Sequence, residues 1–207
     1  MTRCAILGAS GQGKVIAELA ELNGYKDIVF FDDRWPMIES VEHWSVIGDT
    51  NSLKNTCSDF DAVVVAIGDN NIRIDKINEF ESLGAKLASL VHPKAVVSQY
   101  ALLGKGTMIM AGAVLGVFSK IGKGCIINTS ASVDHDCELG DGVHISPGVN
   151  LAGGVQVGSN SWVGIGAQIK QVIKIGNNVI IGAGATVVKD IVDNETVIGC
   201  PARPLIK

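Results

Sequence analysis

The chain has 207 residues and a formal net charge of −4 at pH 7, and without a strong basic field we expect no nucleic-acid partner. Its five cysteines are an odd number without Cys-x-x-Cys spacing, which favours neither a disulfide framework nor a structural zinc site and is typical of a reduced, cytoplasmic compartment. No apolar stretch approaches the roughly twenty residues of a membrane span, so we expect no membrane insertion.

The composition changes near residue 90, which divides the chain into two expected domains, 1–90 and 91–207. The first carries 8 lysines and arginines against 14 acidic residues, and the second 9 against 7. Strands are expected at 4–7, 28–31 and 62–67, and helices at 14–23 and 71–82. This alternation predicts a small α/β domain with a Rossmann-like parallel sheet of the doubly wound type.

A glycine-rich turn stands between the first expected strand and helix. It reads Gly8-Ala9-Ser10-Gly11-Gln12-Gly13-Lys14-Val15. Its glycines fall as GxxGxG where a dinucleotide fingerprint has GxGxxG, and as a P-loop it lacks the hydroxyl that holds magnesium, because Val15 stands there. Both motifs bring backbone N–H groups and a helix amino end to a phosphate. We therefore favour a nucleotide-containing ligand, bound by Gly8, Ser10, Gly11, Gln12 and Gly13, over a plain tight turn.

Polar residues follow the other two expected strands of this domain. Asp32 and Asp33 come after the second strand, and Gly68-Asp69-Asn70 after the third. Open α/β sheets bind ligands beyond the carboxyl ends of their strands, so all five are candidate substrate-binding residues. For each, the alternative is a solvated loop residue.

From Val97 to Val187 every sixth residue is aliphatic, sixteen times in succession. A strict six-residue repeat predicts a parallel β-helix, in which three hexads form one triangular coil. The residue after each aliphatic is often glycine, for which we expect a corner with unusual backbone angles. The residue two before it is small or β-branched and should also point inward. A β-sandwich fits poorly, because its irregular loops would interrupt the register.

Two of the four histidines, His135 and His144, lie nine residues apart, which is half of an expected coil. His135 should stand at a corner, and His144 should point outward from a flat side. Within one subunit the two imidazoles then lie on roughly opposite sides, so a shared site would need neighbouring subunits. No acidic partners converge at metal-ligand spacing, and we expect no metal. A plain surface position is the alternative for each histidine.

The chain resembles the bacterial hexapeptide-repeat sugar acyltransferases of the sialic acid O-acetyltransferase type. Within them it is most similar to the trimeric UDP-4-amino-sugar N-acetyltransferases of the bacillosamine pathway. The resemblance covers nearly the whole length and rests on the glycine turn, Asp32-Asp33, residues 66–70, Val91-His92-Pro93, Asn128-Thr129, His135-Asp136, His144 and Gly199-Cys200-Pro201-Ala202. It implies that the β-helix of residues 91–207 is left-handed and forms a homotrimer, and that domain 1–90 binds a nucleotide sugar.

The resemblance further implies acetyl-CoA-dependent N-acetylation of a nucleotide-linked amino sugar, with a UDP-sugar favoured, for surface glycan synthesis. Transfer would be direct and metal-free. His135 matches the general base that takes a proton from the sugar amine. Asp136 matches a position that is more often Glu, and would either orient that imidazole or favour its charged form.

The same resemblance assigns the acyl-donor site. His144 matches a residue near the acetyl carbonyl, and Asn128 a polar residue of the same pocket. Gly153 matches an N–H donor to the developing oxyanion. Ile165 and Ala183 match backbone contacts to the pantetheine arm.

Other functions remain open. O-acetylation of a sugar hydroxyl, for instance on sialic acid, would use the same residues. A non-catalytic binding or scaffold protein would keep the β-helix and lose the chemistry. A nucleotide hydrolase is disfavoured by Val15 in the turn.

Overall fold

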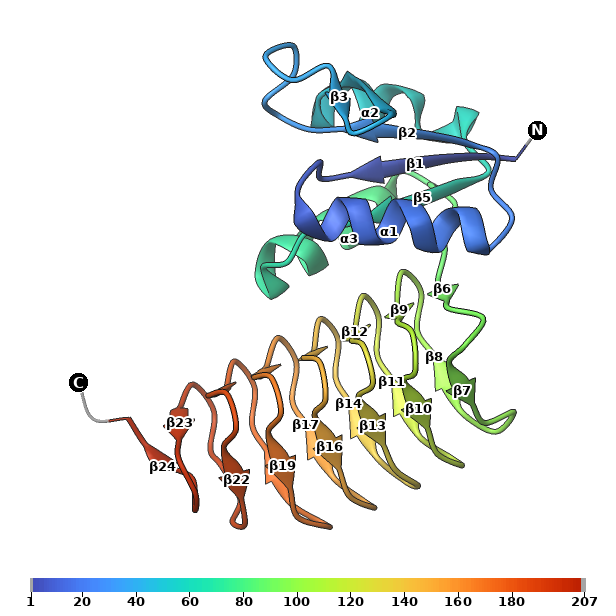
Figure 1. Ribbon diagram of the computed structural model, residues 1–207. Helices are drawn as coiled ribbons and strands as arrows, with labels where there is room; N and C mark the ends of the chain where they lie inside the picture. The colour runs from blue at the N-terminus through green and yellow to red at the C-terminus, as the bar shows by residue number, and fades with distance from the viewer. Residues whose placement is uncertain (1, 206–207) are drawn as a thin grey trace. The chain divides into compact units, whose positions relative to one another are not determined.

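The computed structural model describes residues 2–205, and the chain divides into two compact units that meet in sequence at Leu90 and Val91 (Figure 1). Within the described residues, no helix is both long enough and apolar enough to cross a bilayer.

The first unit is built on a five-stranded sheet with the order β3-β4-β2-β1-β5. Its strands are β1 (Arg3–Leu7), β2 (Asp27–Phe31), β3 (Ser40–Val41), β4 (Trp44–Gly48) and β5 (Ala62–Val65). All neighbours are parallel except β3, which runs antiparallel to β4. The three predicted strands are present, and the last ends two residues early. Every residue of β5 is buried, as expected for a central parallel strand covered on both faces.

Helices α1 (Gly11–Leu22), α2 (Thr50–Thr56) and α3 (Asn70–Ser82) and the short 3-10 helix η1 (Cys57–Asp59) complete this unit. Helix α1 starts inside the glycine turn, three residues before the predicted start, and buries Ile16 and Leu19. The other two α-helices are N-capped by aspartates, with Asp49 accepting from the Ser52 N–H at 2.7 Å. Each loop that leads into α2 and α3 is therefore fixed by a carboxylate.

The second unit is a parallel β-helix with three sheets. The first sheet contains β7 (Val96–Val97), β10 (Val114–Leu115), β13 (Ser132–Val133), β16 (Asn150–Leu151), β19 (Gln168–Ile169) and β22 (Thr186–Val187). The second contains β8 (Leu102–Leu103), β11 (Lys120–Ile121), β14 (Glu138–Leu139), β17 (Gln156–Val157) and β20 (Lys174–Ile175). The third contains β6 (Leu90–Val91), β9 (Met108–Ile109), β12 (Ile126–Ile127), β15 (His144–Ile145), β18 (Trp162–Val163), β21 (Ile180–Ile181), β23 (Thr196–Ile198) and β24 (Arg203–Pro204).

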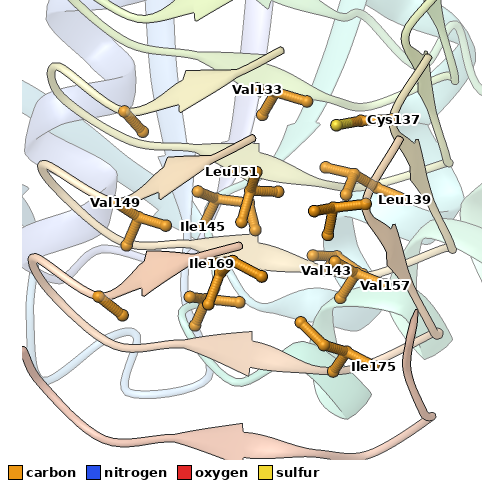
Figure 2. Packing of buried hydrophobic residues seen from close by; sticks show 14 of the residues in the cluster. Val133, Cys137, Leu139, Val143, Ile145, Val149, Leu151, Val157, Ile169 and Ile175 are labelled. Atoms are coloured by element: carbon orange, nitrogen blue, oxygen red, sulfur yellow. The ribbon is translucent and has the colours of Figure 1, made fainter. Parts of the chain in front are cut away.

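The predicted repeat is confirmed strand by strand. The sixteen aliphatic positions are the second residues of β7 to β22, and from coil to coil a residue pairs with the one eighteen positions away, as Val133 does with Leu151. Figure 2 shows some of these side chains, among them Val133, Ile145 and Leu151, filling the interior of the coils together with Cys137, Val143 and Val149. Burying each such aliphatic side chain contributes about 1.5 to 3 kcal/mol.

The glycines that follow the aliphatic residues were expected to have unusual backbone angles, and this prediction is wrong. The glycines that follow eight of the sixteen aliphatic residues have no left-handed backbone; instead, a Cβ on Gly158 would lie 2.5 Å from the carbonyl carbon of Gly176 in the next coil. At Gly158, close coil stacking therefore excludes a side chain. The left-handed residue stands three positions after the aliphatic, and it is Gly154 in one coil, Asp136 (φ 56°) in another and Val172 (φ 54°) in a third.

Candidate active site

The corner after β13 carries His135 and Asp136. The left-handed backbone of Asp136 is held by its N–H, which donates to the carbonyl of Val117 in the preceding coil at 3.1 Å. The His135 Nδ1 and Asp136 Oδ2 atoms are 2.8 Å apart. Because a carboxylate only accepts, Nδ1 carries the proton, and the neutral ring keeps its lone pair on Nε2. This bond, with the nearby charge of Asp134, raises the pKa of His135 above its usual value.

The imidazole of His135 lies directly over Gly153 of the next coil. A Cβ built on Gly153 would overlap Nε2 and lie 2.5 Å from Cε1. The same corner is fixed by the backbone, since the Gly154 N–H donates to the carbonyl of His135 at 2.9 Å. The missing side chain of Gly153 is therefore what allows the ring to occupy this position.

A cavity of about 510 Å³ lies on the first sheet. Its lining includes Asp134, the residue that precedes His135 in the sequence. Its floor includes a ladder of polar side chains: Ser132 donates to Asn150 at 2.7 Å, and Asn150 donates to Gln168 at 3.2 Å. Hydroxyl and amide groups of this kind suit a polyhydroxylated ligand.

His144 stands on another side of the β-helix, in β15 of the third sheet. Its ring stacks on Trp162 of the neighbouring strand, with ring centroids 5.8 Å apart and an interplanar angle of 6°. The indole Nε1–H of Trp162 donates to the Ser146 hydroxyl at 2.7 Å. On the other side, Asn128 Nδ2 lies 3.2 Å from His144 Nε2. The imidazole is thus held between a flat ring and an amide.

A groove of about 440 Å³ runs along this sheet. It is lined by His144, Ser146, Pro147, Trp162, Gly164, Ile165, Ile180, Ile181, Gly182 and Ala183. The structure therefore brings together three of the four predicted cofactor-binding residues, His144, Ile165 and Ala183. The fourth, Gly153, lies under His135 instead.

The glycine turn of the first unit is shaped by close backbone approach. Gly8 has φ 107°, and a Cβ there would lie 2.9 Å from the carbonyl oxygen of Ala66. A Cβ on Gly13 would overlap the carbonyl oxygen of Gly8. Lys14 forms an ion pair with Glu42 and so does not extend over the turn as a P-loop lysine would.

The two aspartates after β2 are hydrogen-bonded within the protein. Asp32 accepts from the Ala9 N–H of the glycine turn at 2.8 Å and from Arg34 Nε at 2.8 Å. The bonds from Arg34 and Ala9 hold the pKa of the Asp32 carboxyl at about 2. Asp33 accepts from the Thr50 N–H at 2.9 Å. Both carboxylates therefore shape loops at the carboxyl edge of the sheet.

The segment after β5 is fixed in the same way. Asp69 is the N-cap of α3, and Asn70 Oδ1 accepts from Arg73 at 2.8 Å. The guanidinium of Arg73 is fully buried and also donates to the carbonyls of residues 67 and 68 at 3.0 Å each. Sequence reasoning missed Arg73 and Arg34, because nothing in their neighbours' pattern distinguishes them from surface arginines.

Within residues 2–205, no group of three or more His, Cys, Asp or Glu side chains is arranged to hold a metal ion. Cys125 and Cys137 are buried among the inward side chains of the coils.

Two family models match the chain: the PglD N-terminal domain over residues 3–80, and the bacterial transferase hexapeptide (six repeats) over residues 118–153 and 154–189. A curated relative, UDP-N-acetylbacillosamine N-acetyltransferase of Bacillus subtilis (strain 168), is 38% identical over 117 residues. That match covers 54% of this chain and 52% of the relative, so it spans about half of the relative's length.

Solved structures match over the whole chain. The acetyltransferase domain of PglB from Neisseria gonorrhoeae FA1090, in complex with acetyl coenzyme A, is 45% identical, covers 98% of both chains and has a TM-score of 0.95. PerB from Caulobacter crescentus, in complex with CoA and GDP-perosamine, is 36% identical over 100% of this chain and 98% of its own, with a TM-score of 0.94. WeeI from Acinetobacter baumannii AYE is 28% identical over 99% and 100%, with a TM-score of 0.91. The predicted fold class, a Rossmann-like sheet followed by a left-handed parallel β-helix, is confirmed.

Proposed function

Because the chain belongs to the family of hexapeptide-repeat sugar N-acetyltransferases that includes PglB and PerB, we propose that it transfers the acetyl group of acetyl-CoA to the amino group of a nucleotide-linked amino sugar. The observation that carries the proposal is the hydrogen bond between the imidazole of His135 and the carboxylate of Asp136. Its Nδ1 is engaged by Asp136, and its Nε2 is left as the basic nitrogen at the surface of the coil. A protein that only binds ligands has no need of an imidazole held in this way.

In the proposed reaction the sugar amine attacks the thioester carbonyl while His135 Nε2 takes a proton from the nitrogen. The C–S bond then breaks, the amide forms, and the CoA thiolate receives a proton, so no covalent enzyme intermediate is needed. Asp136 orients the ring and favours its charged form, which is the form that exists during transfer. In this proposal the Gly153 N–H faces the developing oxyanion.

The acyl donor is assigned to the groove on the third sheet. His144 lies at its polar end, and Ile165 and Ala183 offer backbone groups along its length, which suits the amide-bearing pantetheine arm. The PglB and PerB domains were solved with acetyl coenzyme A and CoA respectively, which supports this class of cofactor.

The first unit is assigned to the nucleotide sugar. Ser10, Gly11, Gln12 and Gly13 present backbone N–H groups at the start of α1, where a phosphate is favoured. Gly8 shapes the turn before them, and its own N–H donates to the carbonyl of Phe31 at 2.9 Å. Loops around Asp32, Asp33, Gly68, Asp69 and Asn70 enclose the same edge of the sheet. A UDP-sugar is proposed, as in the name of the Bacillus subtilis relative, whereas PerB binds GDP-perosamine.

We further propose that the active enzyme is a cytoplasmic homotrimer. His135 and the groove of His144 lie on different sheets of one β-helix, so a neighbouring subunit is needed to bring acyl donor and base together. The polar ladder beside Asp134 then offers hydrogen bonds to sugar hydroxyls.

The test is a thiol-release assay with acetyl-CoA and a panel of UDP-, GDP-, CMP- and dTDP-linked sugars carrying either an amine or a hydroxyl at the acceptor position. We expect turnover with an amino sugar of one nucleotide class and an acetamido product by mass spectrometry. His135→Ala should lower turnover by roughly a hundredfold to ten-thousandfold. His43→Ala, at an exposed histidine of the first unit, is the matched control and should retain turnover. Transfer to hydroxyls alone, or wild-type turnover in His135→Ala, would reject the proposal.

A further inference from the structure

Cys137 ends the corner that carries His135 and Asp136, and its side chain is buried in the interior of the coil (Figure 2). Its Sγ atom lies 3.3 Å from the carbonyl oxygen of Ala152 in the next coil. Because a carbonyl oxygen only accepts, the thiol donates its hydrogen in this contact. Burial raises the pKa of the Cys137 thiol, so the hydrogen stays on the sulfur near neutral pH. The carbonyl of Ala152 is therefore held by a donor inside the β-helix.

The peptide group that carries this carbonyl also carries the N–H of Gly153. The peptide is trans and planar, so its C=O and N–H bonds point in opposite directions. Since the carbonyl of Ala152 is directed inward to Cys137, the N–H of Gly153 is directed outward, to the side on which the half-exposed imidazole of His135 lies. Within residues 2–205, no backbone or side-chain atom accepts from this N–H.

Another corner of the β-helix shows what an N–H in this arrangement binds. Thr107, at the same inward position of its hexad as Cys137, donates through Oγ1 to the carbonyl of Gly122 in the next coil at 2.8 Å. The N–H of that peptide belongs to Lys123, and it donates to a carboxylate oxygen of Asp141 at 2.7 Å. An inward hydroxyl thus anchors one end of the peptide, and the other end meets a negatively charged oxygen.

A third corner repeats the arrangement. The hydroxyl of Ser161 donates to the carbonyl of Gly176 at 2.7 Å, and the N–H of the same peptide, from Asn177, donates to Asp193 Oδ1 at 2.8 Å. This N–H is the main group that holds the pKa of the Asp193 carboxyl below its usual value, so it stabilises negative charge. At the corner of His135 a thiol replaces the hydroxyl, and the oxygen is left to a ligand.

We infer that Cys137 is a positioning residue, whose thiol anchors the carbonyl of Ala152 and so aims the N–H of Gly153 at a negatively charged oxygen of the ligand. Resting on the proposed function, this oxygen is that of the thioester carbonyl, which gains charge as the amine attacks. The hydrogen bond on the carbonyl also polarises the peptide and strengthens its N–H as a donor. Cys137 acts through the peptide, and no bond to its sulfur is made or broken.

Cys125 provides a matched control within the same chain. It is buried at the equivalent position of its hexad, and its thiol donates to the carbonyl of Gly140 in the next coil at 3.2 Å. The two corners that this bond joins, 122–125 and 140–143, contain no histidine. Alanine variants of Cys125 and Cys137 therefore lose the same kind of bond, and only one of them loses it beside His135. Both variants should fold, because alanine occupies this position in other hexads: Ala113, Ala131, Ala167 and Ala185.

The first experiment compares these variants in the thiol-release assay. We expect Cys137→Ala to lower kcat roughly tenfold, because complete removal of an oxyanion donor costs about a hundredfold to a thousandfold and this change only loosens the donor. The KM for the nucleotide sugar should stay unchanged, as should the acidic limb of the kcat/KM profile, which reports the pKa of His135. Cys125→Ala should lower the thermal midpoint as much as Cys137→Ala does and keep the wild-type kcat.

A serine variant tests whether the lost donor is the cause. Cys137→Ser supplies a hydroxyl at the position where Ser161 makes the same bond, so it should recover most of kcat. Equal kcat in the two alanine variants, a loss that serine does not recover, or a shifted acidic limb in Cys137→Ala would overturn the inference.

The second experiment detects the hydrogen bond without any activity. The S–H stretching frequency falls when a thiol donates a hydrogen bond, and an infrared difference spectrum between the wild type and Cys137→Ala isolates the band of Cys137. We expect a frequency below that of N-acetylcysteine methyl ester at high dilution in carbon tetrachloride, where the thiol has no acceptor. A frequency equal to this reference would overturn the inference even if the enzyme is active. Absence of acetyl transfer in the wild-type protein together with the lowered frequency would instead reject the proposed function.

Discussion

Replacing Gly153 with alanine tests whether the space beneath His135 governs catalysis. The added methyl would overlap Nε2 and lie 2.5 Å from Cε1, where an ordinary carbon contact needs about 3.5 Å. The ring must therefore move by about 1 Å, which stretches its 2.8 Å bond to Asp136. A misplacement of about 1 Å can cost on the order of a hundredfold in rate, so we expect kcat/KM to fall by at least roughly that factor.

The stability of the fold should change little, because Gly153 has no left-handed backbone and the imidazole can swing into solvent. The assay is thiol release together with the thermal midpoint, in a double-mutant cycle. In a His135→Ala background, Gly153→Ala should cost almost nothing more, since the ring that it displaces is gone. A full loss in both backgrounds would show that the alanine acts elsewhere, and wild-type turnover in the single variant would refute the steric argument.

Three further changes test electrostatics and buried hydrogen bonds. Asp136→Asn removes the main group that raises the pKa of His135, so this pKa falls and the acidic limb of the kcat/KM profile should move to lower pH; an unmoved limb would contradict the pairing. Asp32 has its folded pKa lowered to about 2, so its stabilisation exists above its unfolded pKa and is lost as the pH falls through the folded value. Asp32→Asn should therefore lower the unfolding free energy in urea by about 1 to 2 kcal/mol at pH 7 and by much less near pH 2. Arg73→Met removes the buried donor of three hydrogen bonds and should cost about 3 kcal/mol in the same assay, whereas a loss below about 0.5 kcal/mol would show that the loop reorganises.

The β-helix could be predicted from the sequence because its environment repeats. Each inward position meets the same neighbours eighteen residues before and after, so the same choice of aliphatic residue recurs at every hexad. The outer hairpin of the first unit could not be predicted in this way. Strand β3 has only two residues at the sheet edge, and β4 buries only Val46 and Gly48 of its five, so these strands show no hydrophobic period in the sequence.

The candidate site was predictable in its residue types and less so in its contacts. His135 and Asp136 are adjacent in sequence, so a corner of the β-helix at this point is enough to bring their side chains into contact. The burial of Arg73 depends on loop carbonyls whose direction is set by tertiary structure, which no local pattern encodes. Glycine was the most ambiguous signal, because a left-handed backbone and a close coil contact both require it, and only the structure separates Gly154 from Gly158.

The strict pairing of residues eighteen apart limits how the length of this protein can evolve. An inserted or deleted block of eighteen residues after β15 would restore every inward partner. It would move His144 relative to the rest of the groove by one strand spacing of roughly 4.8 Å and would also change the residue that lies beneath His135. A block of six would transfer all later strands to a different sheet and would break up the groove while leaving its core residues buried. Natural or engineered variants should therefore differ in length along the β-helix by whole coils, with shorter changes confined to the loops.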